Sequence, residues 1–303
     1  MSVRERQRAA YQWAMTAAAG SPIMAEAGAG RRRSEARGRM NRIVRQPDPA
    51  AGVISKTHMA FQLDGGIAHR ARIGLIVLAT DHTIEHEFRQ IYRLDGVALY
   101  ESRIPNSSEI NAATLAEMER GLASAAAVIL PGTKLDVIAY GCTSGAVVIG
   151  EETVAARIRE ARPGVACTTP ITAGIAGLKK LGAERIALLT PYVDEVNQMF
   201  RRHVEGQGIA VPVMGSFNHG NDNEVARISQ ASIKNAVREL AREPGVDGVF
   251  VSCTSLRVAD IAEELEAELG KPVTSSNHAL AWHCLRLAGV NDSLPGLGRL
   301  FRV

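Results

Sequence analysis

From Arg72 onward, short apolar runs alternate along the chain with longer stretches in which apolar residues recur at helical spacing. The short runs are typical of buried strands, and the longer stretches are typical of amphipathic helices. In the first half, this pattern predicts strands at 72–79 and 137–140, with helices at about 109–127 and from 151 onward. Strands and helices that alternate in this way predict a sheet covered by helices on both faces.

The same order of elements returns in the second half of the chain. The apolar run at 185–189 repeats the character of the run at 72–76, displaced by 113 positions. A helix near 224–241 leads to a strand at 248–251, and the two Cys-Thr-Ser triplets of the chain are 111 positions apart. Two offsets that agree this closely predict a duplicated lobe. We therefore expect an α/β fold with two pseudo-symmetric Rossmann-like lobes, each a parallel four-stranded sheet flanked by helices, and an active site in the cleft between them.

This pattern divides the chain into four parts. Residues 66–172 are the first α/β lobe, residues 173–277 are the second, and residues 278–303 are a C-terminal helix that packs back on the first lobe. Residues 1–65 are an Arg-rich extension, expected to be disordered because its composition buries too little apolar surface to offset the entropy of ordering. A translation-start artefact and a weak contact with a polyanion are the alternatives for this extension.

Charge and cysteine content narrow the class of protein. Residues 1–50 hold ten arginines against four acids, so the net charge of +3 leaves the remainder at about −3, which argues against a nucleic-acid partner. No apolar run is long enough for a membrane span, and the four cysteines include no C-x-x-C pair. Free thiols predict a cytoplasmic protein, and we expect neither a metal site nor a cofactor.

The two Cys-Thr-Ser triplets combine the groups needed for acid chemistry. Cys142 and Cys253 each follow a predicted strand, where a thiol at a helix N-terminus is shifted toward the thiolate. Backbone amides and neighbouring hydroxyls can bind a carboxylate or an enediolate formed from it. The hydroxyls come from Thr143, Ser144, Thr254 and Ser255. One such cysteine is most often a core residue, but two in matching frames favour chemistry, whereas Cys167 and Cys284 lack this context.

Three further polar segments are candidates for substrate contacts, and the first two lie at carboxyl ends of predicted strands. Residues 80–83 and 190–197 follow the first strand of each lobe, and a helix cap explains them as well as a substrate contact does. The loop 218–223 is rich in turn-forming residues, so a solvated turn and amide contacts to substrate both remain open.

Several segments resemble the aspartate/glutamate racemase superfamily, in the branch that holds maleate isomerase and arylmalonate decarboxylase. The likeness covers about residues 72–289 and is strongest to the ectoine-utilisation proteins of that branch. The segments that carry it are ATDHTIEHE (79–87), YGCTSG (140–145), PYVDEVN (191–197), GNDNEVARI (220–228), SCTS (252–255) and TSSNHALAWH (274–283).

The resemblance implies roles for individual residues. Cys142 and Cys253 would be the catalytic cysteines of the two lobes, Thr143, Ser144 and Tyr192 would bind the substrate carboxylate, and Asn223 would hold the substrate. The first-strand loop departs from maleate isomerases, which have asparagine where this chain has Asp81. An acid there repels a second carboxylate and attracts an ammonium. The decarboxylases have glycine at the position of Cys142.

These observations predict an isomerase or racemase of a small carboxylic acid, in which one thiolate removes the Cα proton and the opposite thiol returns one. In a variant, Cys142 adds to a double bond, allows rotation and leaves. An arylmalonate-type decarboxylase and a small-acid binding protein without turnover are the alternatives. The likeness suggests a homo-oligomer, and an acylated diamino acid from ectoine breakdown is a candidate substrate.

Overall fold

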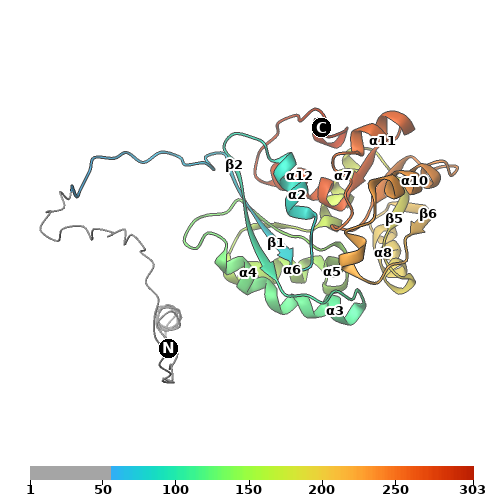
Figure 1. Cartoon of the computed structure of the whole chain (residues 1–303), viewed down its shortest axis with the longest axis horizontal. Coiled ribbons are helices and arrows are strands. Elements are labelled where there is room, and N and C mark those ends of the chain that lie inside the picture. Colours follow the sequence, from blue (N-terminus) through green and yellow to red (C-terminus); the bar gives the residue numbers. More distant parts are fainter. Residues whose placement is uncertain (1–55) are drawn as a thin grey trace, which may run out of the picture. The chain divides into compact units, whose positions relative to one another are not determined.

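The computed structural model of this chain describes residues 56–303. The predicted disorder of the Arg-rich extension therefore falls mainly outside the described residues. Phe61–Val303 forms one compact unit, which contains all the helices and strands discussed below (Figure 1).

The first lobe contains a parallel four-stranded sheet in the order β2-β1-β3-β4. Its strands are β1 (Ala71–Leu78), β2 (Val97–Ile104), β3 (Val137–Tyr140) and β4 (Ala166–Thr168). Strands β1 and β3 are nearly continuous apolar runs, and they are buried almost throughout. Such runs form parallel strands because helices cover both faces of the sheet.

The second lobe repeats this plan with a parallel sheet in the order β6-β5-β7-β8. Its strands are β5 (Arg185–Thr190), β6 (Ala210–Ser216), β7 (Gly248–Val251) and β8 (Val273–Ser275). In each lobe the first strand along the chain is interior and the second is at an edge. The predicted α/β fold with two similar four-stranded lobes is confirmed.

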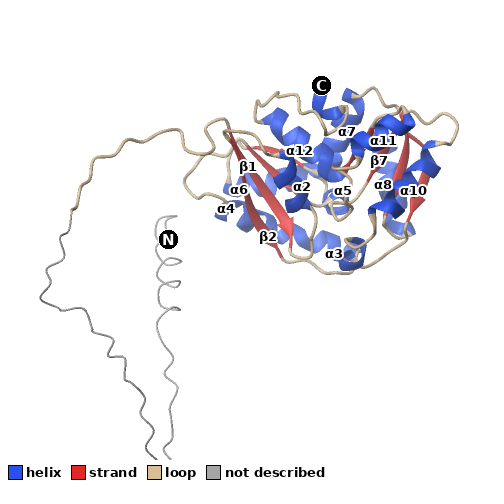
Figure 2. Ribbon diagram, turned by 45° about the horizontal axis from the view of Figure 1, so that its top comes forward, coloured by secondary structure: helices blue, strands red, loops and turns tan. Residues whose placement is uncertain are grey.

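Helices cover both sheets (Figure 2). They are α2 (Ile84–Ile91), α3 (Ala112–Glu117), α4 (Leu122–Val128), α5 (Thr143–Ile149), α6 (Glu151–Ala161), α7 (Pro170–Lys180), α8 (Asp194–Gly206), α9 (Asp222–Val225), α10 (Gln230–Ala241), α11 (Ala262–Leu269) and α12 (Ser276–Leu287). Short 3₁₀ turns occupy Met118–Gly121 and Leu300–Arg302.

Two predicted helices are each divided in the structure. The expected helix at 109–127 is α3 and α4 separated by a 3₁₀ turn that ends at Gly121, a residue of low helix propensity. The expected helix at 224–241 is α9 followed by α10. Ser229 begins α10 because its side chain accepts a hydrogen bond from the amide of Ser232 (3.1 Å).

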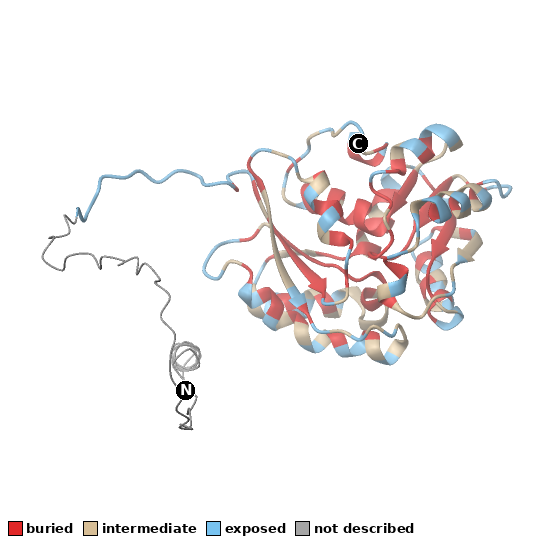
Figure 3. Cartoon of the chain, in the orientation of Figure 1, coloured by how far each residue is buried: buried red, intermediate tan, exposed pale blue. Residues whose placement is uncertain are grey.

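Helix α12 packs against α2 and α7 and also contacts strands of both sheets. The hydroxyl of Tyr92, just after α2, donates to the carbonyl of Ala281 in α12 (2.9 Å). The interior strands and the inner faces of these helices form the core (Figure 3). Within residues 56–303, no helix combines the length and apolar character needed to cross a membrane.

Candidate active site

The two Cys-Thr-Ser triplets lie at the carboxyl ends of interior strands, one in each lobe. Cys142 follows β3 and is the N-cap of α5, where its Sγ accepts a hydrogen bond from the amide of Gly145 (3.3 Å). Cys253 follows β7 and has a φ of 123°, in the region that favours glycine. Backbone strain of this kind persists where surrounding contacts enforce it, and it is concentrated at functional sites.

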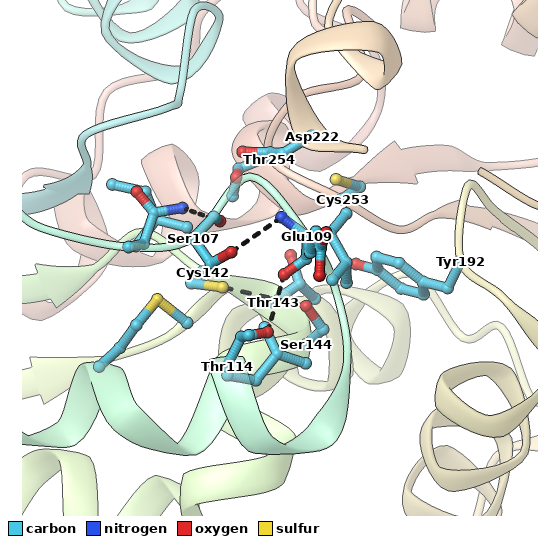
Figure 4. A pocket seen from close by; sticks show the side chains of 15 residues that line it. Ser107, Glu109, Thr114, Cys142, Thr143, Ser144, Tyr192, Asp222, Cys253 and Thr254 are labelled. Atoms are coloured by element: carbon cyan, nitrogen blue, oxygen red, sulfur yellow. Dashed lines mark hydrogen bonds between the residues drawn. The ribbon is translucent and has the colours of Figure 1, made fainter. Parts of the chain in front are cut away.

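Both cysteines line one small cavity, so the structure brings together the two sulfur atoms predicted from sequence (Figure 4). Most of the predicted site residues lie there with them. The cavity is lined by Cys142, Thr143, Ser144, Tyr192, Cys253 and Thr254 among the predicted residues, and by Asp222 and Glu109 among those not predicted. The lining comes from both lobes, which makes the cavity a site between them.

Ser276, at the first position of α12, joins the two triplets. Its Oγ accepts hydrogen bonds from the amide of Cys253 (2.9 Å) and from the hydroxyl of Thr143 (2.8 Å). Ser276 is completely buried, so neither bond is exchanged for one with solvent. Ser276 was not predicted as a site residue. The available signal was the Ser-rich end of β8, because carboxyl ends of parallel strands share one edge of a sheet.

Tyr192 is a buried phenol on the cavity wall. Its hydroxyl lies 3.2 Å from the Oγ of Ser252, and its ring packs beside Phe200 with a centroid separation of 6.1 Å. Burial raises the pKa of Tyr192 well above 10, so the group stays protonated and can donate a hydrogen bond at neutral pH.

Asp222 occupies the cavity wall where Asn223 was predicted to act. Its Oδ1 accepts from the hydroxyl of Ser255 (2.8 Å), and its Oδ2 accepts from the hydroxyl of Thr80. Asn223 and Ser255 are not among the cavity-lining residues. The Oδ1 of Asn223 instead lies 3.1 Å from the Nε2 of His82. Ser255 therefore contacts Asp222 rather than the cavity itself. The predicted substrate contact of Asn223 stays a prediction.

Asp81 lies behind this wall rather than on it. Its Oδ1 accepts hydrogen bonds from the amides of Thr83 (2.7 Å) and Ile84 (2.8 Å) at the start of α2. This geometry matches the helix-cap alternative. The Oδ2 of Asp81 is buried and has no hydrogen-bond partner. Burial, with a smaller contribution from the charge of Asp222, raises the pKa of Asp81 to about 6.

Two loops, one from each lobe, meet beside the cavity. The amide of Ile110 donates to the carbonyl of Gly220 (3.0 Å), and the amide of Asp222 donates to the carbonyl of Ser108 (2.9 Å). Ile110 and Glu109 also line the cavity, so this pairing encloses it.

Burial determines the protonation of the two thiols. It raises the pKa of Cys142 to about 12 despite the hydrogen bond from Gly145, and it raises the pKa of Cys253 well above its ordinary value. The negative charge of Asp222 acts in the same direction on both. The expected helix N-terminus is present at Cys142 but not at Cys253, because turns follow Cys253 and the next helix, α11, begins at Ala262. At Cys142 desolvation outweighs the helix N-terminus, so the expectation of a favoured thiolate is wrong for this site.

The other candidate chemistry is limited. In the described part of the chain, no three His, Cys, Asp or Glu side chains are grouped to hold a metal ion. Cys167 and Cys284 do not line the cavity. The residues that line the cavity offer thiols, hydroxyls and the carboxylates of Asp222 and Glu109.

Comparison with known proteins adds relatives of known activity. A family model described as arylmalonate decarboxylase matches residues 100–301. The chain is 37% identical over 179 residues to arylmalonate decarboxylase of Bordetella bronchiseptica, which covers 58% of this chain and 71% of that protein. It is 28% identical over 245 residues to maleate isomerase of Nocardia farcinica, which covers 76% of this chain and 95% of that protein.

A solved structure has the same fold. A mutant of Nocardia farcinica maleate cis-trans isomerase with a covalently bound succinylcysteine intermediate aligns with a TM-score of 0.70 at 25% identity. The alignment covers 77% of this chain and 98% of that one. The two-lobed arrangement is thus shared over nearly the whole length of the relative.

Proposed function

Because this chain belongs to the arylmalonate decarboxylase family, we propose that it is a cofactor-independent isomerase or racemase of a small carboxylic acid. Family membership supports an enzyme that isomerises or decarboxylates such an acid. The choice of an isomerase depends on one observation: a thiol from each lobe lines the same cavity, together with hydroxyls able to bind a carboxylate. Such a pair suits removal of a proton from one face of a substrate and return of one to the other.

The proposed reaction is a proton transfer through a carbanion. One cysteine, as thiolate, takes the Cα proton and becomes a thiol, while the electron pair of the broken C–H bond moves into the carboxylate to give an enediolate. The opposite thiol then gives its proton to the other face of Cα and becomes the thiolate. Hydrogen bonds from the hydroxyls of Ser144 and Tyr192 and from the backbone amide of Thr143 stabilise the enediolate, because preorganised donors act strongly on developing charge in a water-poor site.

A covalent variant has support from the succinylcysteine seen in the relative. In that variant, the thiolate of Cys142 adds to one carbon of a conjugated double bond, and the former double bond becomes free to rotate. The carbon–sulfur bond then breaks, which restores the double bond in the other geometry and releases the thiolate. This variant needs an unsaturated acid, whereas proton transfer needs only a hydrogen on Cα.

A decarboxylase is the second candidate, and the 37% identity to arylmalonate decarboxylase favours it. The presence of Cys142 argues against a decarboxylase, because the resemblance places glycine at this position in the decarboxylases. A binding protein without turnover needs no reactive group on both sides of its ligand. We include acylated diamino acids from ectoine breakdown among the candidate substrates. We also propose that the protein forms a homo-oligomer.

The test is hydrogen–deuterium exchange at Cα in heavy water, followed by NMR over a panel of enantiopure small acids. We expect Cys142→Ala and Cys253→Ala each to reduce exchange by about 10²-fold to 10⁴-fold, the range typical of a lost general acid or base. Cys167→Ala is the matched control, since this cysteine lies outside the cavity, and it should retain exchange. Full activity in either cavity variant refutes the proposal. Carbon dioxide release from an arylmalonate that survives Cys142→Ala identifies a decarboxylase instead.

A further inference from the structure

The charges around the cavity are unbalanced. Among the described residues that line it, Asp222 and Glu109 are acids, whereas none is Lys, Arg or His. Asp81 adds a third carboxyl behind the wall, with a buried Oδ2 that has no partner. A pocket for a small acid must hold one carboxylate, and the turn at Thr143 and Ser144 offers the hydroxyl of Ser144 and backbone amides for it. The rest of this pocket presents negative charge.

The carboxylate of Asp222 is held in place by hydrogen bonds that leave it able to accept further ones. It is 6% exposed, and each of its oxygens accepts one hydroxyl hydrogen bond, from Ser255 and from Thr80. A carboxylate has about four lone-pair sites, so two remain. No cation pairs with Asp222 among the described residues. A buried carboxylate of this kind is complementary to a positive charge on a ligand.

We propose that Asp222 binds the cationic nitrogen of the substrate, which makes the substrate a small amino acid with one carboxylate and one ammonium. This inference rests on the proposed function, because it assumes that the cavity of Cys142 and Cys253 is the substrate site. It sets this chain apart from relatives named for maleate and arylmalonate, which are dicarboxylates. A second carboxylate near Asp222 would meet a like charge with no basic side chain on the wall to offset it.

The same contact favours a thiolate in the cavity. The charge of Asp222 disfavours ionisation of both Cys142 and Cys253. An ammonium beside Asp222 cancels that charge and attracts a thiolate directly, so the substrate's own nitrogen promotes loss of a thiol proton to water. An acid without nitrogen binds in a cavity whose thiols stay protonated, and it should react poorly even where it binds.

The experiment compares pairs of compounds that differ only in the nitrogen, using the full-length protein. The probes are alanine and propionate, aspartate and succinate, and 2,4-diaminobutyrate and 4-aminobutyrate, with maleate added as an unsaturated dicarboxylate. Cα exchange by NMR measures reaction, and the ligand-induced shift in melting temperature measures binding independently of turnover. We expect at least one α-amino acid to bind and exchange at least 100-fold better than its partner without the α-nitrogen.

Asp222→Asn keeps the size of the side chain and removes its charge. It should lower the binding of that amino acid at least 10-fold and strengthen the binding of its dicarboxylate or unsubstituted counterpart. Glu224→Gln is the matched control, because it removes an equal charge from an exposed site in the same helix that does not line the cavity. It should leave the preference unchanged. The wild-type comparison alone remains decisive if Asp222→Asn fails to fold.

The outcomes separate this inference from the proposed function. Exchange that depends on both cysteines but favours succinate or propionate leaves the proposed function standing and overturns the inference. Amino-acid binding that depends on Asp222 without any Cα exchange supports the inference and refutes the proposed reaction. Binding of none of the amino acids, or an amino-acid preference that Asp222→Asn retains, overturns the inference.

Discussion

Replacing Ser276 by alanine tests whether one hydroxyl holds the two Cys-Thr-Ser turns in place. The substitution leaves the amide of Cys253 and the hydroxyl of Thr143 without their acceptor in a fully buried site. A buried donor left without a partner costs about 1–3 kcal/mol, and a typical hydrogen bond contributes about 1 kcal/mol net. We therefore expect Ser276→Ala to lower the free energy of unfolding by about 2–4 kcal/mol.

The effect on activity has a separate cause. Cys253 has a φ of 123° and needs neighbouring contacts to keep that conformation. Without the bond to Ser276 the backbone can relax, which moves the sulfur away from its place on the cavity wall. We expect kcat on the exchanging substrate to fall by about 10²-fold, the size typical of a small misplacement of a reacting group.

Urea unfolding followed by circular dichroism measures the first effect, Cα exchange of the substrate measures the fall in kcat, and amide hydrogen exchange at Cys253 measures the relaxation of its backbone. Ser124→Ala is the control, because Ser124 is exposed on α4 and its hydroxyl bonds only the carbonyl of Gly121. That variant should stay within about 0.5 kcal/mol of the wild type. A Ser276→Ala protein with wild-type stability and unchanged exchange at Cys253 would show that Ser276 does not position the turn.

Two further predictions concern buried groups. Glu87 is 2% exposed and accepts hydrogen bonds from the amides of Val258 and Ala259 and from Asn277, and burial raises its pKa from 4.5 to about 7. Because the folded pKa is the higher one, its contribution to stability is complete below about pH 4.5 and is lost as the pH rises through 7. The free energy of unfolding of the wild type, measured in urea relative to that of Glu87→Gln, should thus fall by about 3 kcal/mol between pH 4.5 and pH 7. A difference that stays constant with pH would contradict the raised pKa of Glu87. Cys142 and Cys253, at 4% and 6% exposed, should react with iodoacetamide more slowly than the partly exposed Cys167 in the native protein, as measured by peptide mass spectrometry; faster labelling of either would contradict the enclosed cavity.

The fold was predictable because its signals are local. Parallel strands covered on both faces must be apolar along their length, so the runs at 72–79 and 248–251 stand out from the sequence itself. The repeat offset then fixed the number of lobes, and the strand ends located Cys142 and Cys253. Breaks inside helices were missed at Gly121, which has low helix propensity, and at Ser229, whose capping hydrogen bond competes with a continuous helical pattern.

Contacts between the lobes were not predictable in the same way. Ser276 acts on two turns that precede it by 133 and 23 positions, and no local pattern marks such a pairing. Desolvation of the thiols is also a property of the assembled site. The helix N-terminus at Cys142 is visible in the sequence, whereas the burial that outweighs it depends on residues from both lobes.

Asp222 lines the cavity and its neighbour Asn223 does not, so the contact between the two loops decides which side chain faces the substrate. In a short loop, a shift of one residue turns a different side chain into the cavity, and here the register is fixed by backbone bonds from Asp222 to Ser108 and from Ile110 to Gly220. The pairing that encloses the cavity is therefore also what points the carboxylate of Asp222 inward. Enclosure and charge selection are carried by the same few residues, so a change in the loop at Ser108 should alter substrate preference even though Asp222 itself is retained.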